Sequence, residues 1–144
     1  MRLIVLVLVL MLTVPAAPAR ADIVVLANPD PWIEQALKDI SQGKTDEFAR
    51  NYVKLIDKAD MLDYLADNLR VLSRMGAPEF MEKVSDQKHG TALREVVYLA
   101  LYSRANYIYF KFVMKKNRSG WLITNFAFKD EASQLFPKGF VGPQ

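Results

Sequence analysis

The sequence of 144 residues contains no cysteine. The protein therefore forms no disulfide bond, performs no thiol chemistry and has no cysteine with which to bind a metal or carry a lipid anchor. It also contains a single histidine, His89, and no recognisable metal-ligand spacing around it. We therefore expect no metal and no cofactor, and a core that is held by packing alone.

The sequence also lacks an apolar run of the roughly 20 residues that a membrane-spanning helix needs. The run from Leu3 to Val14 has only 12 residues and follows the positively charged Arg2. Small residues come next, and Ala19 and Ala21 form an A-x-A cleavage pattern. This three-part pattern predicts an export signal, with an uncleaved membrane anchor as the alternative.

Cleavage near Ala21 would divide the chain into a signal peptide, residues 1–21, and a single domain, residues 22–144. The mature protein would be periplasmic or secreted, with no membrane span. Its 17 basic and 16 acidic residues predict no nucleic-acid partner. Acidic residues outnumber basic ones by 13 to 9 in residues 22–89, and basic residues outnumber acidic ones by 8 to 3 in residues 90–144. This separation of charge could steer an approaching partner, or the two halves could pair with each other.

Apolar residues at helical spacing predict three helices before residue 76. The first begins near Asn28 and ends at Gly43. The second is expected to be capped by Thr45, and the third to begin at Asp60 and end before Gly76.

The spacing of the apolar residues along the sequence changes after residue 78. Residues 79–88 are ambiguous between a helical turn and an edge strand, whereas residues 94–102 are rich in β-branched and aromatic side chains. Residues 107–115 alternate like a half-buried strand, and residues 121–128 follow a turn. We expect Leu122, Thr124, Phe126 and Phe128 to share one face of that last strand. Helices followed by strands predict an α+β fold, in which three helices pack on an antiparallel sheet of three to four strands.

Three segments carry a resemblance to a known family: GTALREVVY (residues 90–98), YIYFKF (residues 107–112) and GWLITNFAF (residues 120–128). In this order they are similar to small bacterial exported proteins of the nuclear transport factor two-like superfamily. The resemblance implies a cystatin-like α+β cone, in which a curved sheet wraps the helices and leaves a cavity at its wide end. It implies no particular activity, because the superfamily holds isomerases, dehydratases, epoxide hydrolases and proteins without catalysis.

Two residues are the candidates for catalysis. His89 could act as a general base, but it lies in a polar, turn-like stretch. Glu95 is the one carboxylate that the strands carry between Gly90 and Lys129, yet it is next to Arg94. A cation beside a carboxylate opposes the raised pKa that a general acid or base needs. We therefore expect no catalytic residue and lean against an enzyme.

Four strand residues could line a pocket instead: Tyr98, Tyr102, Tyr109 and Lys111. Their hydroxyls and one cation on an apolar wall would suit a small ligand, although tyrosines also occur on ordinary sheet faces. The resulting hypothesis is a non-catalytic exported domain that binds a small apolar or amphiphilic ligand or a protein partner. A hydratase or isomerase using Glu95 or His89, and a homodimeric assembly module that pairs through the sheet, are the alternatives.

Overall fold

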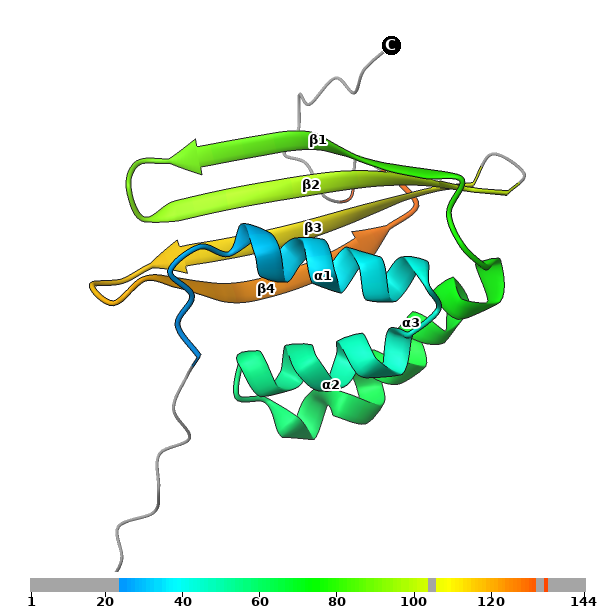
Figure 1. Ribbon diagram of the computed structural model, residues 1–144, viewed down its shortest axis with the longest axis horizontal. Helices are drawn as coiled ribbons and strands as arrows, with labels where there is room; N and C mark the ends of the chain where they lie inside the picture. The colour runs from blue at the N-terminus through cyan, green and yellow to red at the C-terminus, as the bar shows by residue number, and fades with distance from the viewer. Residues whose placement is uncertain (1–23, 104–105, 132–133, 135–144) are drawn as a thin grey trace, which may run out of the picture.

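The computed structural model describes residues 24–103, 106–131 and 134. The predicted signal peptide lies outside this part of the chain. Helices come first and strands second (Figure 1). The elements are α1 (Asp30–Ser41), α2 (Thr45–Leu55), the 3-10 helix η1 (Ala59–Met61), α3 (Leu62–Met75), β1 (Phe80–His89), β2 (Leu93–Tyr102), β3 (Asn106–Lys116) and β4 (Trp121–Lys129).

The four strands form one antiparallel sheet in the order β1-β2-β3-β4, so each strand pairs with its neighbour in sequence. Short turns dictate this meander, because they can only join adjacent antiparallel strands. The α+β class predicted from the sequence is confirmed, and the ambiguous segment at residues 79–88 belongs to edge strand β1. None of the helices in the described ranges is both long and apolar enough to cross a membrane.

The hydrophobic core lies between the helices and one face of the sheet (Figure 1). Alternate residues of the two central strands face the helices, and Val96, Phe110 and Phe112 are completely buried there. Helix α1 contributes Ile33 and Ile40 to the same cluster. Burial of such a side chain is worth about 1.5–3 kcal/mol, so packing can replace the missing disulfides.

Phe126 on β4 is the centre of an aromatic cluster within this core. Its ring lies 4.8 Å from Phe48 and 5.8 Å from Tyr52, both on α2, measured between centroids. On the sheet it lies 5.1 Å from the ring of Phe112. Each edge-to-face or tilted contact of this kind contributes about 0.5–1.5 kcal/mol of stability beyond the hydrophobic contribution of the area it buries. The cluster therefore holds α2 against the last strand.

A β-bulge interrupts β4 and corrects one of the predictions. Asn125 pairs with Val113, but Ile123 pairs with Met114, so Thr124 is an extra residue in the strand. Ile123 consequently enters the core, while Thr124 is exposed. The prediction that Leu122 and Thr124 share a face with Phe126 was wrong, because the bulge shifts the alternation by one residue.

Thr45 has a different role from the cap that we expected. The N-cap position of α2 is Lys44, and Thr45 lies in the first turn with 3% of its surface exposed. Its Oγ1 atom lies 2.6 Å from Oγ of Ser73, at hydrogen-bond distance. The hydroxyl thus links α2 to α3, because a buried polar group must find a partner.

Arg94 joins α1 to the sheet. This nearly buried guanidinium contacts Asp86 of β1 with its Nε and Nη2 atoms, at 2.8 and 2.6 Å, and Asp30 of α1 with Nη1, at 2.8 Å. The hydrogen bond from Arg94 lowers the pKa of Asp86 to about 2. Asp86 therefore stays ionised, and the two carboxylates hold the guanidinium between helix and sheet.

Replacing Asp86 with asparagine should lower the free energy of unfolding at pH 7 by about 1–3 kcal/mol, because it leaves a nearly buried cation with one carboxylate. The wild type should lose this contribution as the pH falls from about 4 to about 2, through the lowered pKa. Urea denaturation at pH 7, 4 and 2 measures both effects. The control is Asp67→Asn, which removes an exposed pair with Arg70 and should change stability little. Equal stability of the two variants would refute the role of Arg94.

Candidate functional site

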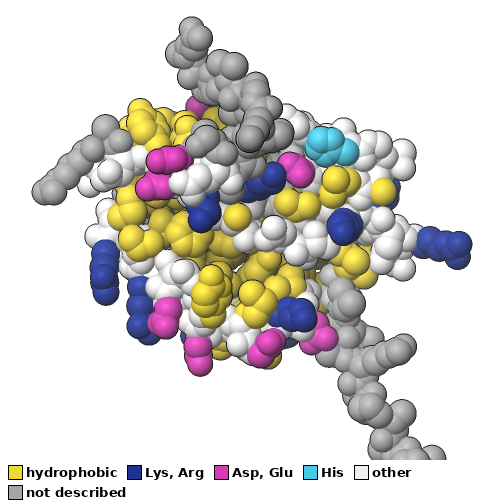
Figure 2. Space-filling model, turned by 180° about the vertical axis from the view of Figure 1, so that it is seen from behind, with side chains coloured by type: hydrophobic (Ala, Val, Ile, Leu, Met, Phe, Trp, Pro, Cys, Tyr) yellow, Lys and Arg dark blue, Asp and Glu magenta, His cyan; other side chains and the backbone are white. Residues whose placement is uncertain are grey.

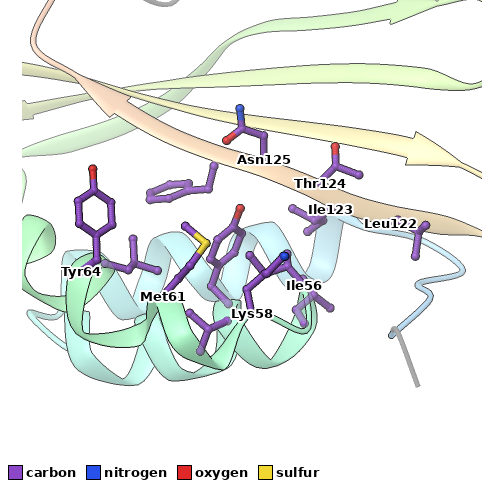
Figure 3. A pocket seen from close by; sticks show the side chains of 13 residues that line it. Ile56, Lys58, Met61, Tyr64, Leu122, Ile123, Thr124 and Asn125 are labelled. Carbon is purple, nitrogen blue, oxygen red and sulfur yellow. The ribbon is translucent and has the colours of Figure 1, made fainter. Parts of the chain in front are cut away.

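An apolar pocket of about 420 Å³ lies between the helices and β4, an edge strand of the sheet (Figure 3). It is built from the C-terminal part of α2, the η1 turn, the beginning of α3 and the first half of β4. Its lining residues are Tyr52, Val53, Leu55, Ile56, Lys58, Met61, Tyr64, Leu65, Leu122, Ile123, Thr124, Asn125 and Phe126.

The β-bulge determines how β4 lines this pocket. The side chains of Thr124 and Asn125 point away from the helices (Figure 3). The Thr124 hydroxyl donates a hydrogen bond to the carbonyl oxygen of Val113. Since those two side chains turn away, the apolar surface on the β4 side comes from Leu122, Ile123 and Phe126.

Tyr52 closes the inner end of the pocket. Its side chain is almost completely buried, and burial raises its pKa to about 12. A hydrogen bond with the backbone of Phe126 partly offsets this effect. The phenol is therefore neutral at pH 7 and ties α2 to β4, which is an edge strand of the sheet in the described part of the chain.

Lys58 is the one charged residue among those that line the pocket. It lies in the short connection between α2 and η1, and its side chain is exposed at the rim (Figure 3). Asp57 and Asp60 flank it in the sequence but do not line the pocket. The pocket therefore combines an apolar wall with a single cation, a common composition for sites that bind small ligands.

A second hollow of about 350 Å³ extends the pocket along α3 and β4. The two share Tyr64, Leu65 and Phe126, and the second one continues to Val71 and Lys129. Three large apolar side chains beside these hollows are unusually exposed: Met61 by 39%, Tyr64 by 70% and Val71 by 50%. Together they mark a groove whose apolar surface is open to a ligand.

The four predicted ligand residues lie on opposite faces of the sheet. Tyr98 and Tyr102 face the helices, where Tyr102 is part of the core and Tyr98 packs against it. Tyr109 and Lys111 alternate with the core residues of β3 and lie on the outer face. None of the four lines the pocket beside β4. A ligand role for them, and a homodimer through the sheet, both stay predictions.

The two candidate catalytic residues also lie away from the pocket. Glu95 Oε2 lies 2.8 Å from Nζ of Lys111 in an ion pair on the outer face. His89 ends β1 and is exposed. Within the described ranges, no group of three or more histidine or acidic side chains is arranged to hold a metal ion.

Sequence reasoning did not find the residues that line the pocket. Lys58 and Met61 lie in a short polar connection, and Leu122 follows a turn, so nothing local indicates that they meet. The contact between α2 and β4 joins residues about 70 positions apart, and the bulge shifts the face of β4. One local signal was present. Met61, Tyr64 and Val71 are apolar residues that lie outside the buried face of α3, which Leu69 and Leu72 form.

Fold and pocket together define an α+β domain of three helices and a four-stranded antiparallel meander, with an apolar pocket at an edge strand. No family model and no curated protein matches the sequence. Among solved structures, the chain is similar to a crystal structure from Campylobacter jejuni described as an NTF2-like transpeptidase. The identity is 17%, the TM-score is 0.44, and the match covers 67% of this chain and 96% of that one.

Two tyrosines, Tyr52 in the pocket wall and Tyr102 in the core, allow a matched test of hydrogen bonding by buried hydroxyls. The Tyr102 hydroxyl is buried and has no hydrogen-bond partner among the described residues, whereas the Tyr52 hydroxyl bonds to the Phe126 backbone. Tyr102→Phe should leave the free energy of unfolding unchanged or raise it by up to about 1 kcal/mol, because it removes an unpaired polar atom. Tyr52→Phe should lower it by about 1 kcal/mol. Chemical denaturation compares them, and the reverse order would contradict this account.

Proposed function

We propose that the protein is an exported, non-catalytic domain that binds a small amphiphilic ligand in the pocket between α2, α3 and β4. The observation that carries the proposal is an apolar pocket of about 420 Å³ with one lysine at its rim. Pockets for small molecules are typically about 300–1,000 Å³, mainly apolar, and furnished with a few polar groups that orient the ligand.

Binding is favoured over catalysis by the chemistry of the lining. General acid–base catalysis needs a titratable group within hydrogen-bond reach of the reacting atoms. The residues that line the pocket include no aspartate, glutamate or histidine. Glu95, the candidate for a hydratase or isomerase, is already paired with Lys111 on the far face of the sheet.

The position of Lys58 favours a ligand with a negatively charged head group. A carboxylate at the rim would form a charge-assisted hydrogen bond with the lysine, while an alkyl chain lies along Leu65 and Phe126. The adjoining hollow gives such a chain room to extend along α3 toward Val71. A medium-chain fatty acid therefore matches the shape and the charge of the groove.

Decanoate should raise the melting temperature of the protein, and Lys58→Gln should weaken its binding about fivefold, because one charge-assisted hydrogen bond at an exposed site is lost. Binding of decanol, which has the same chain and no charge, should change little in this variant. The control is Lys54→Gln, which removes an exposed lysine that does not line the pocket. Isothermal titration calorimetry measures the affinity of the wild type and of both variants for decanoate and decanol.

A variant that fills the pocket tests the site itself. Leu65→Trp places a larger ring where the two hollows meet and should abolish stabilisation by either ligand. A circular-dichroism spectrum and melting curve without ligand show whether the variant is folded. If a folded Leu65→Trp protein binds decanoate as well as the wild type does, the ligand does not occupy this pocket.

Export is the other half of the proposal, and it is supported by the charged, apolar and small-residue parts of residues 1–21. Expression in a bacterium should yield a protein whose intact mass, measured by mass spectrometry, equals that of residues 22–144. Ala21→Leu should block this processing, because the cleavage site requires small residues. A wild-type mass that still contains residues 1–21 would contradict cleavage and favour the uncleaved anchor.

A further inference from the structure

One end of the sheet carries four exposed cations and is here called the basic end: Lys88, Lys115, Lys116 and Arg118. We propose that this end docks on the surface of an anionic lipid membrane. The proposal concerns a surface separate from the ligand pocket and does not depend on it.

The cations converge because the β1–β2 and β3–β4 turns lie at the same end of the sheet (Figure 1). Leu93 pairs with Lys115 across β2 and β3, and the backbone N–H of Lys116 donates a hydrogen bond to the carbonyl of Ala92. These pairings bring the two turns together. In Figure 2, basic side chains extend from the same end as His89, the chain's single histidine.

The charge of the basic end is not neutralised within the described part of the protein. Residues 87–93 and 114–122 include no aspartate or glutamate. The carboxylates that come next along the strands already have partners, because Asp86 pairs with Arg94 and Glu95 pairs with Lys111. Asp57, Asp60 and Asp63 belong to the helical layer, in the connection after α2, in η1 and in the first turn of α3. The basic end thus presents a positive surface to solvent.

The path of the N-terminal segment favours a membrane over other polyanions. Leu26 and Trp121 exchange two backbone hydrogen bonds of 2.8 Å, and Val25 lies against Gly120 in the turn of the basic end. The polypeptide therefore enters the domain beside these cations. The apolar run at residues 3–14 precedes this point by only 11 residues, which span at most about 40 Å. While that run is held in a membrane during export, the basic end is tethered within about 40 Å of the lipid.

Trp121 suits the same setting. Its ring lies at the basic end, with Nζ of Lys116 5.6 Å from the ring centroid. Tryptophan and lysine are both favoured at the boundary between lipid head groups and water. Each basic side chain near an anionic surface strengthens binding by about fivefold, so four together would give a weak, salt-sensitive and reversible association.

The test measures binding to phosphatidylcholine vesicles with and without phosphatidylglycerol. It uses the mature chain from Asp22, because the hydrophobic core lies within Ile33–Ile123 and needs no residue of the signal. The wild type should bind only vesicles that contain phosphatidylglycerol, and about 1 M salt should release it. The triple variant Lys88→Gln, Lys115→Gln and Arg118→Gln should bind about a hundredfold more weakly. It leaves the contact between Lys116 and Trp121 in place.

The matched control removes three exposed cations, Lys38→Gln, Lys44→Gln and Arg74→Gln. They lie in the last turns of α1 and α3 and at the N-cap of α2, and these helix ends are at the opposite end of the molecule (Figure 1). The control has the same net charge as the test variant and should bind the vesicles nearly as well as the wild type. Equal losses in the two variants would show a general charge effect and overturn the proposal. Binding to an acidic polysaccharide but not to vesicles would also overturn the proposal. Equal binding to vesicles with and without phosphatidylglycerol would do the same.

Discussion

The contact of α2 with the edge strand β4 is the interaction on which the rest of the structure depends. Phe126 brings together rings from α2 and from the sheet, and the Tyr52 hydroxyl bonds to the backbone of the same residue. Without this contact the helices would cover only the centre of the sheet, and the pocket would lose one wall. A chain without cysteine relies on such packing, because no covalent link can hold α2 in place.

The pocket exists because the contact between α2 and β4 is incomplete. Phe126 and Tyr52 close the inner end, while η1, the beginning of α3 and the bulged part of β4 line an open hollow. Apolar side chains such as Met61 consequently face a hollow rather than a partner. The proposed ligand would contact surface that the fold itself leaves uncovered, and the proposed membrane surface lies nearby, at the turn where β4 begins.

The larger features were predictable from the sequence because they depend on local patterns. Helical spacing identified α1, α2 and α3, β-branched and aromatic composition identified β2, and alternation with turn residues identified β3 and β4. Where the structure corrected a prediction, as for the Thr45 cap and the face of β4, the cause was tertiary. Thr45 bonds to Ser73 instead of capping its helix, since Ser73 approaches from another helix. Tyr98 and Tyr109 lie on opposite faces of the sheet, which follows from register and not from residue type.

By itself, the sequence determined the α+β class, the order of the elements, the absence of disulfides and the segregation of charge along the chain. Each of these follows from residue type or from short-range periodicity. Only the tertiary structure decided that residues 52–65 and 122–126 line one pocket, and that Lys88 and Lys115 lie at one end of the sheet. The physical reason is that these neighbours are chosen by packing between distant segments and by strand register, including one extra residue in β4, and neither leaves a local pattern in the sequence.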